Sequence, residues 1–178
     1  NMIDLLCITH GLIGVELTSD ANSNRIIGNI IGLNPNLSGV SGNTTGIRIY
    51  DGSDSNTIIN NYIGGNSTYG VEILDSNDNS LRNNYIGTND TSTTLGNGLD
   101  GIFIHGTSTG NTVGGVSEDD YNVISSNGHN GIWINGAATT AVAYNRIGTN
   151  RLGSSDKGNT WNGIYVSAGC LLYTSPSP

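Results

Sequence analysis

The chain has 178 residues, enough for one domain, and carries a formal net charge of −8 with only 6 Lys and Arg residues. Such an acidic chain is a poor partner for nucleic acid or an anionic membrane surface, because both are bound through basic patches. No run of about 18 apolar residues occurs, so the sequence holds no candidate transmembrane helix. The 27 glycines, together with frequent asparagine, are typical of a chain that turns very often.

A short motif of glycine, apolar residue, any residue and apolar residue recurs along the chain, first at 14–17. Six glycines open its copies: Gly14, Gly46, Gly70, Gly101, Gly131 and Gly163. They stand 24 to 32 residues apart, and a near-regular period of this size indicates a repeat architecture. The alternation inside each copy predicts a short strand with two inward apolar side chains and one outward side chain.

Two further apolar stretches follow the motif in each period, and in most periods both begin with Asn. The first period has them at 24–27 and 29–32, and the second at 56–59 and 61–64. Three strands per period predict a parallel β-solenoid, whose coils must stack because no coil can bury its own apolar face. The remaining longer segments are expected as loops. Three of them, at about 33–45, 88–100 and 149–162, share one corner, and 116–121 forms a separate excursion.

Equivalent residues of successive coils should form ladders along the stack. The Asn that opens the third stretch aligns in five periods. These residues are Asn29, Asn61, Asn84, Asn122 and Asn145. Stacked amides can bond to one another and to the turn backbone, so we expect a structural Asn ladder at one corner of the coil.

The phrases Gly-Ile-x-Ile, Asn-x-Ile and Asn-x-Ile-Gly-Thr-Asn, the last of them at 84–89 and 145–150, resemble the repeats of the pectate-lyase-like superfamily. The resemblance covers about residues 11–169 and is strongest to repetitive regions of large bacterial secreted and surface proteins. It implies an all-β fold, a right-handed parallel β-helix (solenoid) of about five to six coils with three short strands each. It implies no single function, because the superfamily includes lyases, hydrolases, epimerases, tailspikes and non-catalytic surface arrays.

The outward position of the motif strand carries the most suggestive variation. Along the chain it reads Glu16, Arg48, Glu72, Phe103, Trp133 and Tyr165. We interpret Arg48 as the counter-ion of the two glutamates rather than as the base of a lyase. The aromatic half predicts an exposed row, with Tyr50 and His105 beside it. Three readings of that row stay open: stacking for stability, contact with sugar rings and contact with a protein.

Carboxylates suggest two further hypotheses. Asp119 and Asp120 with His105 faintly resemble pieces of a polygalacturonase site, although the surrounding motifs of that family are absent. Asp51 and Asp75 follow the motif glycine at the same offset in neighbouring coils, so they could stack into a turn pair that holds Ca²⁺. A solvated turn explains the same spacing.

We therefore interpret residues 1–169 as one β-helix repeat domain, a fragment of a longer array with an incomplete first coil. The segment 170–178 reads as an irregular tail that resembles translated sequencing-adaptor read-through. The expected role is a non-catalytic extracellular or cell-surface module for spacing, adhesion or carbohydrate contact. The alternative is a polysaccharide-active enzyme region, either a lyase, a glycoside hydrolase or an epimerase. Expected partners are a polysaccharide or a cell-surface protein, with self-association through open coil ends. We expect no nucleic acid, no membrane insertion and no cofactor other than Ca²⁺.

Overall fold

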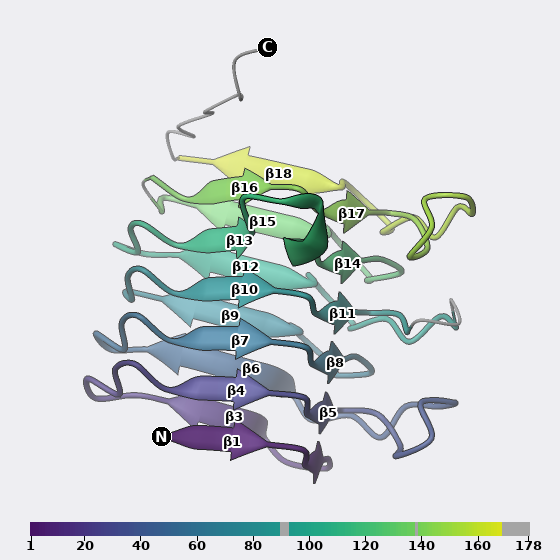
Figure 1. Ribbon diagram of the computed structural model, residues 1–178, viewed down its shortest axis with the longest axis horizontal. Helices are drawn as coiled ribbons and strands as arrows, with labels where there is room; N and C mark the ends of the chain where they lie inside the picture. Colours follow the sequence, from purple (N-terminus) through teal and green to yellow (C-terminus); the bar gives the residue numbers. More distant parts are fainter. Residues whose placement is uncertain (90–92, 138, 169–178) are drawn as a thin grey trace.

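The computed structural model describes residues 1–89, 93–137 and 139–168, which form a right-handed parallel β-helix of six coils (Figure 1). Each coil contributes one strand to each of three parallel sheets, so the predicted fold class is confirmed. The segment 170–178, which we interpreted from the sequence as an irregular tail, lies outside the described residues. Within the described residues, no helix has the length and apolarity needed to cross a membrane.

The three sheets each contain six strands in coil order. Sheet A consists of β1 (Met2–Asp4), β4 (Arg25–Ile27), β7 (Thr57–Ile59), β10 (Ser80–Arg82), β13 (Thr112–Gly114) and β16 (Ala141–Ala143). Sheet B consists of β2 (Cys7–Ile8), β5 (Ile30–Ile31), β8 (Tyr62–Ile63), β11 (Tyr85–Ile86), β14 (Val123–Ile124) and β17 (Arg146–Ile147). Sheet C consists of β3 (Ile13–Leu17), β6 (Thr45–Tyr50), β9 (Val71–Leu74), β12 (Ile102–His105), β15 (Ile132–Asn135) and β18 (Ile164–Ser167).

The recurring motif forms the strands of sheet C, in register from coil to coil. Ile102 pairs with Val71 below it and Ile132 above it, and all three side chains are fully buried. The glycine of the motif is required by close stacking. A Cβ added at Gly70 would lie 2.6 Å from the carbonyl oxygen of Gly101, and four other motif glycines meet the next coil at 2.5 to 2.7 Å. Only glycine fits such an approach.

The core is a narrow column of aliphatic side chains between the three sheets. Ile58 and Leu81 come from sheet A, Ile63 and Ile86 from sheet B, and Ile73 from sheet C, all without solvent exposure. Because every strand is short and its outward residues alternate with inward ones, each coil contributes only a few core residues. The column becomes a hydrophobic core only when several coils stack.

The aligned Asn side chains stack at the corner between sheets A and B. Asn61 donates its backbone N–H and its Nδ2 to Asn84 Oδ1, both at 3.0 Å. The same Nδ2 donates to the carbonyl oxygens of Ile26 and Ile59, at 2.9 and 3.1 Å. Equivalent bonds join Asn29 to Asn61 and continue to the last two members of the row. The ladder therefore satisfies backbone groups that the tight corner leaves without strand partners.

Two more Asn ladders stand at the other corners. One precedes the strands of sheet A and contains Asn24, Asn56, Asn79 and Asn111. The other precedes sheet C and contains Asn43, Asn66, Asn97, Asn127 and Asn159. The sequence signal for the second is an Asn three or four residues before every motif glycine except the first, Gly14.

The longer loops follow strands β5, β11 and β17 of sheet B and project from the same edge of the stack (Figure 1). Each is pinned near its base by an antiparallel bridge, Leu33 to Val40, Thr88 to Thr94 and Thr149 to Asp156. The separate excursion lies between β13 and β14 and contains the short 3₁₀ helix η1 (Glu118–Asp120). The three loops and the excursion thus lie where the spacing of the repeats predicted them.

Candidate functional site

The charged half of the outward row on sheet C forms a network centred on Glu72. Arg48 Nε lies 3.0 Å from Glu72 Oε2, and His105 Nε2 lies 3.2 Å from Glu72 Oε1. The guanidinium of Arg48 also sits 4.6 Å from the ring centroid of Tyr50. Glu16 makes no ion pair within the part of the chain that the structure describes. Arg48 is thus the counter-ion of one glutamate rather than of two.

The aromatic half of the row is a stack, and its first member is buried rather than exposed. Phe103 is only 6% exposed. Its ring lies 4.1 Å from His105 at 8° and 4.3 Å from Trp133 at 22°, with Tyr69 tilted against it at 5.0 Å. The prediction of an exposed Phe103 was wrong because in-register strands bring neighbouring rings into contact, and each covers the next.

This stacking limits what the row can bind. A sugar ring packs on the free flat face of an aromatic ring, and the nearly parallel rings of Phe103, His105 and Trp133 turn their faces toward one another. Trp133 Nε1 also donates to Ser167 Oγ at 2.9 Å. Tyr165, 44% exposed and 6.1 Å from Trp133, has the most accessible ring of the row.

Tyr69 and Asp100, which the sequence reasoning missed, lie beside this stack. The carboxylate of Asp100 is buried and accepts bonds from the backbone N–H and Nδ2 of Asn130, at 2.9 and 2.6 Å. Burial, followed by the negative charges of Asp100 and Glu72, raises the pKa of the Tyr69 hydroxyl. The sequence feature that could have identified them is their shared position directly before a motif glycine.

The three residues of the polygalacturonase-like hypothesis belong to different parts of the coil. His105 ends β12 of sheet C and is bound to Glu72. Asp119 and Asp120 lie in η1, between a strand of sheet A and a strand of sheet B. Asp120 lies 3.7 Å from Arg82 and accepts a hydrogen bond from Ser117, so its partners come from its own corner.

Asp51 and Asp75 occupy equivalent turns after β6 and β9, both with left-handed backbone, φ 58° and 49°. Their carboxylates are engaged by the turns of other coils. Asp75 Oδ1 accepts the backbone N–H of Thr107 at 2.7 Å and its hydroxyl at 3.0 Å, and Asp51 Oδ2 accepts the hydroxyl of Ser19 at 3.4 Å. Among the described residues, no cluster of three or more His, Cys, Asp or Glu side chains is placed to hold a metal ion.

The hydrogen bonds of Asp75 lead to a pH prediction. The backbone N–H of Thr107, then its hydroxyl, hold the pKa of the Asp75 carboxyl below its ordinary value, with a smaller contribution from His105 and against a small effect of burial. We expect Thr107→Val to raise that pKa while leaving it below its ordinary value, because the backbone donor remains. A ¹³C NMR titration of the Asp75 carboxyl measures it directly.

The lowered pKa of the Asp75 carboxyl makes the stability of the fold depend on pH. A carboxyl whose pKa is depressed on folding stabilises the fold above its unfolded pKa, and this stabilisation is lost as pH falls through the folded value. Thr107→Val should therefore lose less stability on acidification below about pH 4 than the parent chain does. Thr109→Val is the matched control, because the Thr109 hydroxyl donates to Asn77 and not to Asp75. An unchanged Asp75 titration in Thr107→Val would contradict the assignment.

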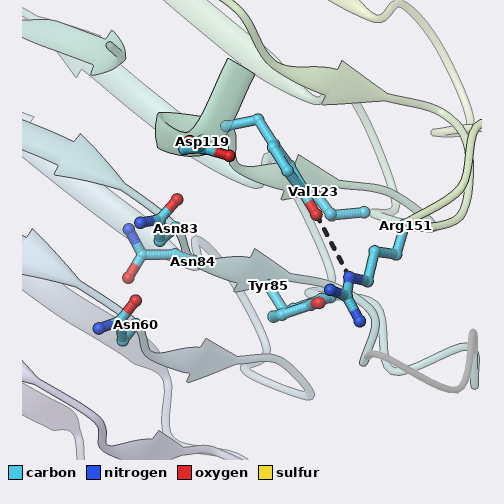
Figure 2. A pocket seen from close by; sticks show the side chains of 8 residues that line it. Asn60, Asn83, Asn84, Tyr85, Asp119, Val123 and Arg151 are labelled. Atoms are coloured by element: carbon cyan, nitrogen blue, oxygen red, sulfur yellow. Dashed lines mark hydrogen bonds between the residues drawn. The ribbon is translucent and has the colours of Figure 1, made fainter. Parts of the chain in front are cut away.

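A cavity of about 290 Å³ lies on the other side of the coil, beside sheet B. Its lining includes Tyr85, Tyr121, Asp119, Arg151 and three Asn residues, and it is shown in Figure 2. Arg151 Nε donates to the Tyr121 hydroxyl at 3.3 Å, and the guanidinium of Arg146 lies 4.2 Å from the centroid of the Tyr121 ring. These contacts, the bond from Arg151 first, lower the pKa of the Tyr121 hydroxyl. The sequence reasoning did not bring these residues together, because the excursion that holds Tyr121 and Asp119 has no counterpart in the other coils.

No protein-family model matches the chain, and neither curated protein sequences nor solved structures give a match.

Proposed function

We propose that this chain is a non-catalytic extracellular or cell-surface module whose basal role is to act as a rigid spacer. The observation that carries the proposal is that the reactive side chains of sheet C are bound to one another. Glu72 is held by Arg48 and His105, and Phe103 is enclosed by rings. A general base needs a polar atom turned toward a substrate, whereas both carboxylate oxygens of Glu72 face a neighbouring side chain, Arg48 or His105.

Rigidity is supported by the continuous ladders. Each coil is joined to the next by three strand pairings, and over most of the stack neighbouring coils are also joined by stacked Asn side chains at three corners. Bending the stack would stretch these short bonds on one side. The extracellular setting is supported by the resemblance of the repeat phrases to regions of large bacterial secreted and surface proteins in the pectate-lyase-like superfamily.

Adhesion or carbohydrate contact on sheet C would fall to the accessible members of the predicted set. Tyr165 is the most exposed, and Tyr50 and Trp133 are half-buried. Phe103 and His105 would support these rings from behind rather than touch a partner. A polysaccharide or a surface protein that contacts the edges of aromatic rings fits this geometry better than a partner that must pack on their flat faces.

A measurement of product release from polysaccharides distinguishes a spacer from a polysaccharide-active enzyme. We expect no product from neutral or acidic polysaccharides, with or without calcium, when the full chain is incubated with each. Trp133 fluorescence, isolated by Trp161→Phe, reports binding in the same samples. Product release that disappears in the Asp119→Ala, Asp120→Ala double variant would overturn the proposal and assign catalysis to η1. Product release that persists in that variant would overturn it too, and would place the catalytic groups elsewhere.

A further inference from the structure

We infer that the cavity beside sheet B is a binding site for one ring of a neutral glycan, separate from sheet C. It lies where the turn excursion with η1 meets the loop after β17 (Figure 2). A volume of about 290 Å³ stands at the lower end of the range for small-molecule pockets, which suits a single sugar ring with part of its neighbour.

The excursion that forms the cavity departs from an otherwise uniform corner. Two residues connect the sheet A strand to the sheet B strand in five coils, whereas 115–122 connects β13 to β14. This segment folds back on the corner: Asp120 lies 3.7 Å from Arg82 and packs so closely on Gly115 that a Cβ there would meet its side chain at 2.3 Å. An ordered insertion on a regular scaffold is where binding residues are usually found.

Two amide side chains of the cavity have no partner in the described chain. Asn60 and Asn83 each precede a member of the Asn ladder and have left-handed backbone, φ 59° and 56°. The corner does not require Asn there, since Gly28 and Tyr144 hold the same conformation in other coils. No hydrogen bond of either amide is formed with the described residues, and Figure 2 shows them one above the other on the side of the cavity below Asp119. Each offers a donor and an acceptor to a ligand.

Aromatic side chains form another part of the lining. Tyr85 stacks on Tyr62 of the coil below, with ring centroids 5.0 Å apart and planes at 12°. Tyr121 is fixed between the guanidinium of Arg146 over its ring and the Nε of Arg151 on its hydroxyl. These contacts position both tyrosines before any ligand arrives, which reduces the ordering cost of binding.

The charge balance favours a neutral ligand. One Arg and one Asp line the cavity, so the formal charges of the lining cancel. Of the two cations beside it, Arg82 lies 3.7 Å from Asp120 and Arg146 lies against the Tyr121 ring. Amides, a carboxylate, a phenol and a guanidinium together provide both donors and acceptors around an aromatic surface. Adjacent hydroxyl groups on a sugar ring, each donating and accepting, complement such a lining.

Binding is tested on the full chain with neutral hexasaccharides of glucose, mannose and galactose, and with polygalacturonate as the acidic comparison. We expect a neutral hexasaccharide to shift the side-chain amide NMR signals of Asn60 and Asn83. The double variant Asn60→Ala, Asn83→Ala should weaken that binding at least tenfold. Asn36→Ala, an exposed Asn in a different loop, should change it less than twofold. Tyr121→Phe keeps the ring and removes the hydroxyl, and should weaken binding several-fold.

Thermal unfolding of each variant separates loss of the site from loss of the fold. No amide shift with any neutral hexasaccharide, or equal affinity in the double variant, would overturn the inference. Binding of polygalacturonate alone would overturn the assignment of a neutral ligand. These outcomes are independent of the spacer role, which is judged by turnover.

Discussion

Replacing Ile102 by Asp is expected to abolish folding. The side chain has no solvent exposure and stands between Val71 and Ile132 in the middle of sheet C. A carboxylate there would lose its hydration among the aliphatic side chains of the core. This costs several kcal/mol, a large part of a typical domain's stability. Far-UV circular dichroism and a melting curve of the soluble fraction measure the effect.

Ile102→Val is the matched control for that substitution. It removes one methylene group and should cost about 1 kcal/mol, leaving a cooperative transition at slightly lower temperature. A soluble Ile102→Asp protein with the melting behaviour of the parent chain would show that this position does not face the core.

Replacing Asn84 by Ala should produce the second largest loss of stability. Asn84 Oδ1 accepts two bonds from Asn61, and its Nδ2 donates to Ile58, Arg82 and Asn122. The substitution leaves the buried backbone N–H of Asn61 without its acceptor and the carbonyl oxygens of Ile58 and Arg82 without this side-chain donor. Because each unsatisfied buried group costs about 1–3 kcal/mol, we expect a loss of about 2–5 kcal/mol, seen in a denaturant titration.

The neighbouring residue supplies the control. Asn83 has left-handed backbone and an amide without a partner in the described chain, so Asn83→Gly keeps the turn and breaks no ladder. Its free energy of unfolding should stay within about 0.5 kcal/mol of the parent value. Equal losses in Asn83→Gly and Asn84→Ala would show that the corner conformation, rather than the ladder, carries the stability.

The fold could be predicted from the sequence because its determinants recur at fixed offsets. The motif glycine allows the next coil to approach closely, the inward Ile and Val are buried, and the corner Asn bonds to its equivalent one coil away. One period of the sequence therefore contains all the residue types that specify the coil. The third Asn ladder was missed although its signal was present, because its spacing from the glycine changes from three residues in Asn43 to four in Asn66.

The candidate sites were harder to predict, since they depend on contacts between residues that do not repeat. The sequence places Phe103, Trp133 and Tyr165 in one outward row, but alternation along a strand cannot show that stacked rings cover one another. Nor does it show that Arg48 binds only one of its two flanking glutamates. The cavity beside sheet B joins an excursion to a loop of the next coil, and no spacing rule relates Tyr121 to Arg151.

The in-register pairing of each coil with its immediate neighbours has a consequence for how such a chain can evolve. Every Asn-to-Asn bond of the ladders joins equivalent residues one coil apart. The insertion of one extra coil by unequal recombination would therefore change contacts only at its two borders. Such an event would lengthen the rod by about 4.8 Å and leave the geometry of distant coils unchanged. The length of the rod can therefore change by whole coils without altering the contacts of the other coils.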